Sequence, residues 1–288
     1  MPRHALVSML AMSLVLGLAS LPAASLAEDV KPKAPETAFP GKLRPDILGI
    51  STESNAESAR TVFDSLFKGR TDTKTDIQQQ KIGGASYVAA LNFSLPAGSK
   101  QNGEMLSTSF SSPASANRAY FVARNLTFAQ DQQPSKADMI KDVMGKYGVP
   151  TIVGDQHLYY IYRKGSIMSV GGKYKESTAL EAIDKPLDPR AAVKLNGDTV
   201  RGSCVAVVKR AQAKAKDPSA MLAEARGANC DGVLSVQLVP GTPADRVGIA
   251  QFTLLDVKQL VSAAAIDNAA LAAGPSEQSM PRGSAPKL

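Results

Sequence analysis

The sequence is poor in the residues that most often build reaction centres. It has no tryptophan, two cysteines and two histidines among its 288 residues, and His4 lies close to the N-terminus. A zinc site needs several Cys or His ligands. A Ser-His-Asp triad would have to use His157, and no Gly-x-Ser-x-Gly elbow supplies the serine. Gly171-Gly172 is too short to hold a phosphate group. The sequence therefore predicts no catalytic, cofactor-binding or metal-binding residues.

The N-terminus has the three parts of a secretory signal. Positive charge at the start is followed by an apolar run from Ala5 to Leu18, and Ser25 and Ala27 occupy the −3 and −1 positions of a cleavage site. The apolar run is shorter than the about 20 residues that span a membrane. We therefore expect cleavage between Ala27 and Glu28, and a mature protein that is periplasmic or secreted.

The charges are mixed along the chain. The formal net charge of +7 comes from 33 basic and 26 acidic residues that form no block. Nucleic-acid binding needs a clustered basic face or a known motif, and neither is present in the sequence. Moderate basicity favours at most a weak attraction to anionic surfaces such as lipid headgroups or cell-wall polymer. We expect no nucleic-acid partner and no integral membrane span.

Both cysteines, Cys204 and Cys230, lie in the predicted mature chain. A pair of cysteines in an oxidising compartment most simply forms one disulfide bond. A redox-active dithiol usually has the spacing C-x-x-C, and these two residues are much farther apart. The sequence therefore predicts a structural Cys204–Cys230 bridge.

Composition divides the chain into five parts. After the signal at 1–27, a Pro-rich linker at 28–45 offers little core. An α+β domain is predicted at 46–170 and a disulfide-containing strand-helix-hairpin-helix unit at 171–273. The Pro-, Ser- and Gly-rich tail at 274–288 is predicted to be disordered. The fold class we expect is α+β, an antiparallel sheet with helices packed on one side.

Apolar periodicity and capping residues place the elements within these parts. Helices are predicted at Ala56–Phe67, Lys136–Lys146 and Pro218–Arg226, and after Asp256. Strands are predicted at Ser86–Leu95, Met105–Ser111, Ala119–Phe128 and His157–Tyr162, around Cys204 through Val208, and at Val233–Val239 and Arg246–Leu255. The polar stretch Arg70 to Lys81 carries no strand signal.

The stretch from Asp138 to Gly165 carries a family resemblance. It reads as a short helix that ends in Gly148-x-Pro150, then Asp155, then a strand with Tyr160-x-Tyr162. This order resembles the second half of a BamE-like (SmpA-like) outer-membrane assembly module, a unit that also recurs in the beta-lactamase-inhibitor-protein fold. The resemblance implies a helix-plus-sheet binding scaffold in the cell envelope.

The most aromatic strand supplies a candidate binding surface. Side chains alternate along a strand, so Leu158, Tyr160 and Tyr162 face one way and His157 and Tyr159 the other. One set packs on the helices, and the exposed members of the set Tyr159, Tyr160 and Tyr162 are candidates for partner contact. Packing of all three tyrosines in the core is the alternative. We interpret His157 as a semi-exposed sheet residue rather than a base.

Three function classes follow from these observations. The first is a non-enzymatic periplasmic or envelope-associated binding protein that acts through protein–protein contacts, with an envelope protein as its partner. The second is a small-molecule or lipid-binding domain that uses a pocket between sheet and helices. The third is a hydrolase with an unrecognised carboxylate site, because two acids can meet from anywhere in a chain.

Overall fold

The computed structural model describes residues 32–39, 41, 44–82, 85–153, 156–167, 194–195, 198–199, 207–208, 218–228 and 230–273. The predicted export signal with its cleavage site at Ala27 and Glu28, the tail from residue 274, and Cys204 all lie outside these residues. What the sequence predicts for them stays a prediction.

The centre of the fold is a nine-stranded sheet in which every pairing is antiparallel. Eight strands run in the order β1-β2-β3-β4-β11-β10-β6-β5, and β7 pairs with β6 off this path. The strands are β1 Lys74–Ile82, β2 Ala85–Leu95, β3 Gly103–Phe110, β4 Ala119–Thr127, β5 Ile152–Val153, β6 His157–Arg163, β7 Ser166–Ile167, β10 Gly232–Pro240 and β11 Val247–Asp256. A separate pair consists of β8 Lys194–Leu195 and β9 Asp198–Thr199.

Four helices flank the sheet in the described part of the chain: α1 Ala56–Leu66, α2 Lys136–Tyr147, α5 Pro218–Arg226 and α6 Val257–Ala272. Their starts follow the capping residues. Asn55 and Ser58 form a reciprocal capping box on α1, and the Ser135 hydroxyl accepts from the Asp138 N–H at 3.0 Å on α2. Two 3-10 turns, η1 Pro113–Ser115 and η2 Gln130–Gln132, complete the set. The predicted α+β class with an antiparallel sheet is confirmed.

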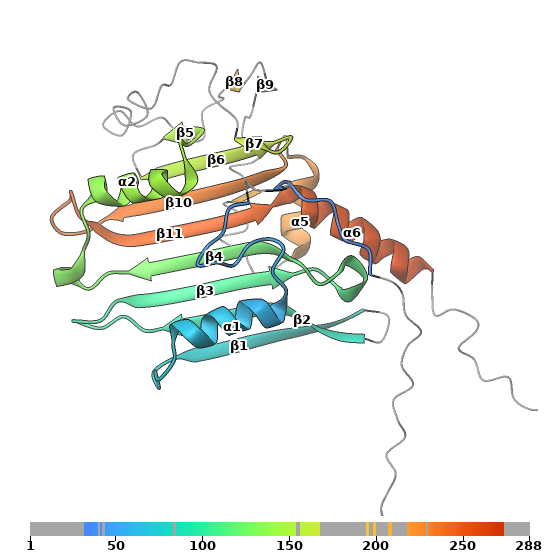
Figure 1. Ribbon diagram of the computed structural model, residues 1–288, viewed down its shortest axis with the longest axis horizontal. Coiled ribbons are helices and arrows are strands. Elements are labelled where there is room, and N and C mark those ends of the chain that lie inside the picture. The colour runs from blue at the N-terminus through green and yellow to red at the C-terminus, as the bar shows by residue number, and fades with distance from the viewer. Residues whose placement is uncertain are drawn as a thin grey trace, which may run out of the picture.

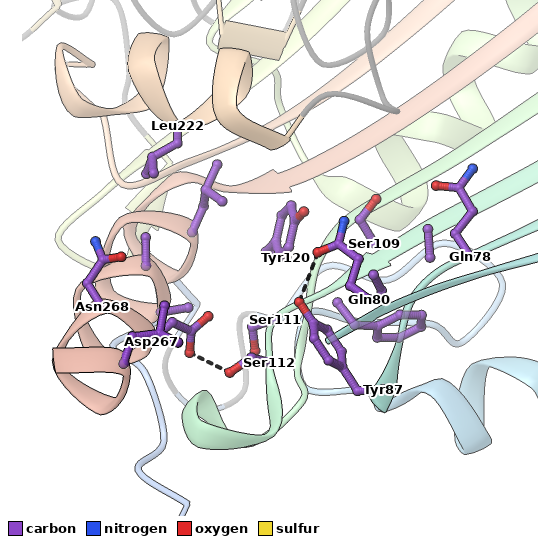
Figure 2. Close-up of a pocket in the computed structure, with 17 residues that line it drawn as sticks. Gln78, Gln80, Tyr87, Ser109, Ser111, Ser112, Tyr120, Leu222, Asp267 and Asn268 are labelled. Carbon is purple, nitrogen blue, oxygen red and sulfur yellow. Dashed lines mark hydrogen bonds between the residues drawn. The ribbon is translucent and has the colours of Figure 1, made fainter. Parts of the chain in front are cut away.

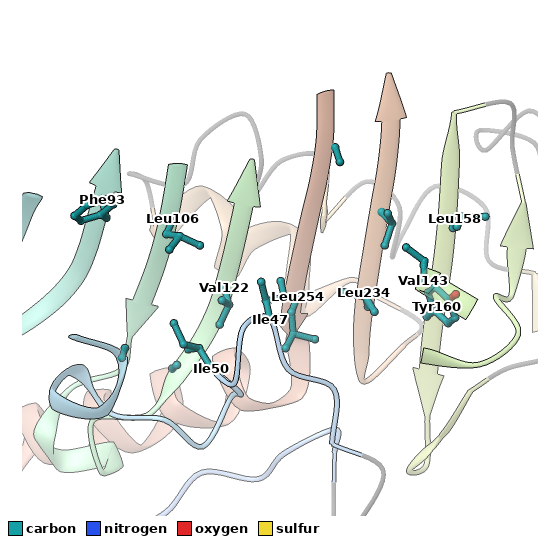
Figure 3. Close-up of a cluster of buried hydrophobic side chains, with 14 of the residues drawn as sticks. Ile47, Ile50, Phe93, Leu106, Val122, Val143, Leu158, Tyr160, Leu234 and Leu254 are labelled. Atoms are coloured by element: carbon teal, nitrogen blue, oxygen red, sulfur yellow. The ribbon is translucent and has the colours of Figure 1, made fainter. Parts of the chain in front are cut away.

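The helices cover both faces of the sheet, so the prediction that they pack on one side is wrong. α1 and α2 lie over the near face in Figure 1, which we call the first face. There Phe63 of α1 and Val143 of α2 pack in one core with sheet residues. Figure 3 shows the sheet side chains of this core, among them Phe93, Leu106, Val122, Leu158, Tyr160, Leu234 and Leu254. The first face therefore carries the larger core.

The opposite, second face carries a separate core. Met221 and Ala225 of α5 and Leu260 of α6 pack there against strand residues. The strand residues include Tyr120, Phe121, Tyr159, Ile161, Val233 and Leu255. Neighbouring residues such as Val233 and Leu234 thus enter different cores, since side chains alternate along a strand. The central strands are buried on both faces for this reason.

The sheet joins parts of the chain that the sequence assigned to two units. β10 and β11 come from the segment 171–273, yet they lie between β4 and β6, as Figure 1 shows. Leu234 and Leu254 share the first core with residues of α1 and α2. The predicted boundary at residue 170 therefore does not correspond to a division of the sheet.

Two local predictions need correction. The polar stretch after α1 forms the edge strand β1, which pairs with β2 along its whole length. Its side chains are mostly exposed, so it has no apolar alternation from which a strand could be inferred. Val207 and Val208, predicted to end a strand, are helical and buried.

Residues 36–39 contact α6 and the sheet. Ala38 and Phe39 are each 1% exposed, and the Phe39 ring meets the Tyr162 ring edge-on with 4.9 Å between their centroids. The prediction that the segment 28–45 adds little to the core is therefore wrong at these two residues. Prolines exclude regular secondary structure from such a segment, but an extended strap still buries apolar side chains.

Asp256 holds this strap in place. The side chain caps α6 by accepting from the Gln259 N–H at 2.8 Å, and it accepts from the Thr37 hydroxyl at 2.5 Å and the Ala38 N–H at 3.1 Å. The Thr52 hydroxyl lies 3.4 Å away. Asp256 is fully buried, and this burial raises the pKa of its carboxyl to about 6 against the opposing effect of the donors. One carboxyl thus joins three separate segments.

Candidate functional site

The tyrosines proposed as a binding surface belong to the interior. Tyr159, Tyr160 and Tyr162 are 1%, 0% and 4% exposed. Tyr160 and Tyr162 lie in the first core and Tyr159 in the second. The predicted alternation along this strand is confirmed, but helices and loops cover both faces, so none of the three tyrosines presents its ring to solvent. The prediction of an aromatic contact surface on β6 is therefore wrong.

His157 is a half-buried residue of β6, opposite Gln237 of β10. Its ring lies parallel to the Tyr159 ring, with 5.6 Å between centroids and 3° between planes. This is the sheet position that the sequence predicted for His157. The acids Asp131, Asp138 and Asp142 lie on η2 and α2, on the surface or at the cap.

Cys230 lies in the second core, 7% exposed, beside Met221 and Val207. Val207 follows Cys204 by three residues in the sequence, so a bridge from Cys204 to Cys230 is compatible with the packing of this core. Cys204 itself lies outside the described residues, and the bridge stays a prediction.

We expect the bridge to contribute about 3 kcal/mol to the free energy of unfolding, because it closes a loop of roughly 26 residues. Urea unfolding with and without a reductant measures this contribution. The double variant Cys204→Ser/Cys230→Ser should lose the same amount and no longer respond to the reductant. Recovery of two free thiols by alkylation of denatured, unreduced protein would contradict the prediction.

A cavity lies on the second face, between α6 and the strands β1 to β4. It measures about 450 Å³, within the range of small-molecule sites. Figure 2 shows Gln78, Gln80, Tyr87, Ser109 and Tyr120 on the sheet side of this space and Asp267 and Asn268 on α6. We call this cavity the α6 pocket. None of its residues was predicted as a site residue.

The sheet side of the α6 pocket is polar but uncharged. The Tyr87 hydroxyl donates to Oε1 of Gln80 at 3.1 Å, and the side chains of Ser109 and Tyr120 are hydrogen-bonded to each other. Burial raises the pKa of Tyr120 well above its usual value, and burial together with the negative charge of Asp267 raises the pKa of Tyr87. Both phenols are therefore neutral donors and acceptors at physiological pH.

The helix side carries Asp267 and Asn268 among apolar residues. Oδ1 of Asp267 accepts from the Ser112 hydroxyl at 2.6 Å, and Ser112 is 1% exposed. The Ser112 oxygen also accepts from the Ala114 N–H at 3.1 Å and caps η1. Leu222 and Leu260 contribute apolar surface to the pocket. The carboxylate is thus held on a fixed hydroxyl at the side of an apolar wall.

The polar groups of the α6 pocket are arranged so that they can bind a ligand. The Ser112–Asp267 pair is a serine beside an acid, but Ser112 is buried and serves as a cap, and the pocket lining includes no histidine. A serine nucleophile needs a base that takes its proton. Within the described residues, no three His, Cys, Asp or Glu side chains are close enough to hold a metal ion. The pocket can therefore hold a molecule by hydrogen bonds, apolar contact and one negative charge.

A larger cavity of about 540 Å³ lies near the ends of β3 and β4. Two of its three cations are held in ion pairs: Arg124 Nε contacts Glu104 Oε1 at 2.6 Å, and Arg70 contacts Asp72 at 2.9 Å. The third cation, Lys100, is an exposed side chain without a fixed position in the cavity wall. A ligand site combines sufficient volume with a few fixed polar groups that can orient the ligand. The α6 pocket is the stronger candidate for this reason.

No helix in the described part of the chain has the length and apolar character to span a membrane. No family model, curated protein or solved structure matches the chain.

The sequence contained one signal for this site. From residue 263 to 273 the chain is alanine-rich, and Asp267 and Asn268 are the only polar residues in that stretch. This acid and the amide beside it interrupt the apolar composition of the helix segment. The sheet residues of the pocket carry no comparable signal.

Proposed function

We propose that this chain is a non-enzymatic binding protein that acts outside the cytoplasm and holds a small polar molecule in the α6 pocket. One observation carries the proposal: a cavity of about 450 Å³ combines an apolar wall on α6 with a floor of neutral hydroxyl and amide groups. Pockets of this composition orient a ligand through a few fixed polar contacts.

Small-molecule binding is favoured over the protein–protein contacts that the tyrosines suggested. Tyr159, Tyr160 and Tyr162 are buried. They therefore offer no surface for contact with a partner protein. The α6 pocket lies between the sheet and a helix, where a ligand-carrying domain would have its site. The predicted export signal supports a periplasmic or secreted location.

An envelope protein partner is the second candidate function. Gly148 caps the C-terminus of α2, Pro150 follows, and β6 carries Tyr160 and Tyr162. This order supports the proposed resemblance to a BamE-like module, although Asp155 of the motif lies outside the described residues. Such a partner would bind on surfaces other than the tyrosine strand.

Pocket filling tests the proposal. Ala264 lines the α6 pocket, whereas its neighbour Ala265 is exposed and does not line it. We expect Ala264→Phe to weaken the binding of polar fragments at least about tenfold, or 1.4 kcal/mol, because the ring occupies their space. Ala265→Phe is the matched control and should leave affinity unchanged. Titration followed by NMR measures both variants.

The proposal fails if no fragment changes the resonances of Tyr87 and Tyr120. It also fails if Ala264→Phe and Ala265→Phe bind fragments equally well while both remain folded. Circular dichroism spectra of the two variants establish the folded state.

A further inference from the structure

The charges around the α6 pocket differ in sign from the charge of the whole chain. The protein is basic overall, with a formal charge of +7, and such a molecule attracts anions in general. The α6 pocket is lined by Asp267 and, among the described residues, by no Lys or Arg. A ligand inside it therefore meets a local negative potential.

The carboxylate of Asp267 has bonding capacity to spare. Oδ1 accepts the Ser112 hydroxyl at 2.6 Å, and no other described group donates to either carboxylate oxygen. Asp267 also forms no ion pair with a described Lys or Arg. An ionised carboxylate offers about four acceptor positions, so several remain for a ligand. Because Ser112 is itself fixed as the cap of η1, binding would cost Asp267 little conformational entropy.

Asp267 and the two tyrosines Tyr87 and Tyr120 line the same cavity, as Figure 2 shows. Asp267 contributes to raising the pKa of both Tyr87 and Tyr120, after the larger effect of burial. A negative charge that disfavours a phenolate favours a cation in the same space. The Tyr87 hydroxyl already donates to Gln80 at 3.1 Å, so its oxygen is available to accept from an N–H group, and its ring can attract a cation.

We infer that the α6 pocket selects organic ammonium ligands, with Asp267 as the counter-ion and the tyrosine and serine hydroxyls as hydrogen-bond partners. The pocket leucines, Leu222 of α5 and Leu260 of α6, contact the hydrocarbon part of the ligand. This inference rests on the proposed function and names the ligand class of the same site. A hydrogen bond to a charged group contributes more binding free energy than one between neutral groups. The charge of the ligand should therefore have the largest effect on its affinity for the pocket.

Three probes of one chain length isolate the charge: aminohexanol, hexanediol and hydroxyhexanoate. They share a hydroxyl and a hydrocarbon chain and differ in one end group, which is an ammonium, a hydroxyl or a carboxylate. We expect aminohexanol to bind the full-length mature protein at least about tenfold more tightly than hexanediol. Hydroxyhexanoate should bind more weakly than hexanediol, since it meets Asp267 with like charge.

Asp267→Asn is the decisive variant. The amide oxygen can still accept from Ser112, so the fold should survive, and Asp267 is only half-buried. Affinity for aminohexanol should fall about tenfold to the level of hexanediol, and affinity for hexanediol should stay the same. Asp131→Asn is the control, because Asp131 is exposed on η2 and outside the pocket; it should change neither affinity.

Equal affinity of the wild type for aminohexanol and hexanediol would overturn the ammonium inference and leave pocket binding intact. Loss of aminohexanol binding in both Asn variants would also overturn it, since the effect would then be one of net charge. If none of the three probes binds, and the Ala264→Phe test fails as well, both proposals are wrong.

Discussion

Replacing Tyr160 with Ala is expected to lower the free energy of unfolding by about 3–5 kcal/mol, as deletion of large buried aromatic side chains does. The ring is fully buried, and it lies 5.9 Å from the Tyr147 ring between centroids. Removing it leaves a cavity in the first core, which the surrounding β-sheet can fill only in part. Denaturant unfolding measures the loss.

Tyr160→Phe is the matched control for this prediction. No described group forms a hydrogen bond with the buried Tyr160 hydroxyl, so the ring without the hydroxyl should leave stability unchanged or raise it by about 1 kcal/mol. A folded Tyr160→Ala protein with wild-type stability would contradict the placement of this tyrosine in the core and restore the contact-surface interpretation.

Asp256→Ala is expected to destabilise the protein by roughly 3–5 kcal/mol, comparable to the cost of breaking other buried polar networks. The substitution removes the cap of α6 and leaves the Ala38 N–H and the Thr37 hydroxyl without their acceptor. The strap that carries Phe39 should then detach. Hydrogen exchange at Ala38 and Phe39, beside an unfolding curve, follows both effects.

The same carboxyl should make stability depend on pH. Its pKa is raised from 3.8 to about 6, so the folded state keeps a proton that the unfolded chain releases between these values. The resulting stabilisation is fully present below pH 3.8 and is lost as the pH rises toward about 6, by roughly 3 kcal/mol in total. Asp256→Asn should lack this decline, whatever its absolute stability. An identical pH profile in wild type and Asp256→Asn would refute the assignment.

Helix positions were predictable because short-range chemistry sets them. Asn55, Ser135 and Asp256 each precede an apolar period of 3.6 residues, and each accepts a backbone N–H at the start of its helix. The hairpin of β10 and β11 was equally predictable, since segments with alternating apolar and polar residues flank a Pro-Gly loop. β1 was missed because an exposed edge strand needs no apolar alternation.

The order of the strands in the sheet could not be predicted from the sequence pattern. β10 and β11 insert between β4 and β6, and no local signal states which distant strand a hairpin joins. Val233 and Leu234 are both buried. Neighbouring residues of a strand are both buried only where the strand is covered on both faces, so their burial reflects the central position of β10. β6 is likewise covered on both faces, and for this reason its tyrosines lie in the core and not on a contact surface.

The α6 pocket depends on the same long-range pairing. Tyr87 lies on β2 and Asp267 on α6, 180 residues later in the chain. Only the sheet order and the position of α6 bring them to one cavity. The sequence shows the unusual Asp267-Asn268 pair in an alanine-rich segment, but not the hydroxyl groups that it faces.

A crystal structure of the protein soaked with aminohexanol tests the central claim most directly. We predict electron density for the ligand in the α6 pocket, with its nitrogen within hydrogen-bond distance of the Asp267 carboxylate and its chain along Leu260. Density confined to other sites, or an α6 pocket closed by protein atoms, would contradict the account.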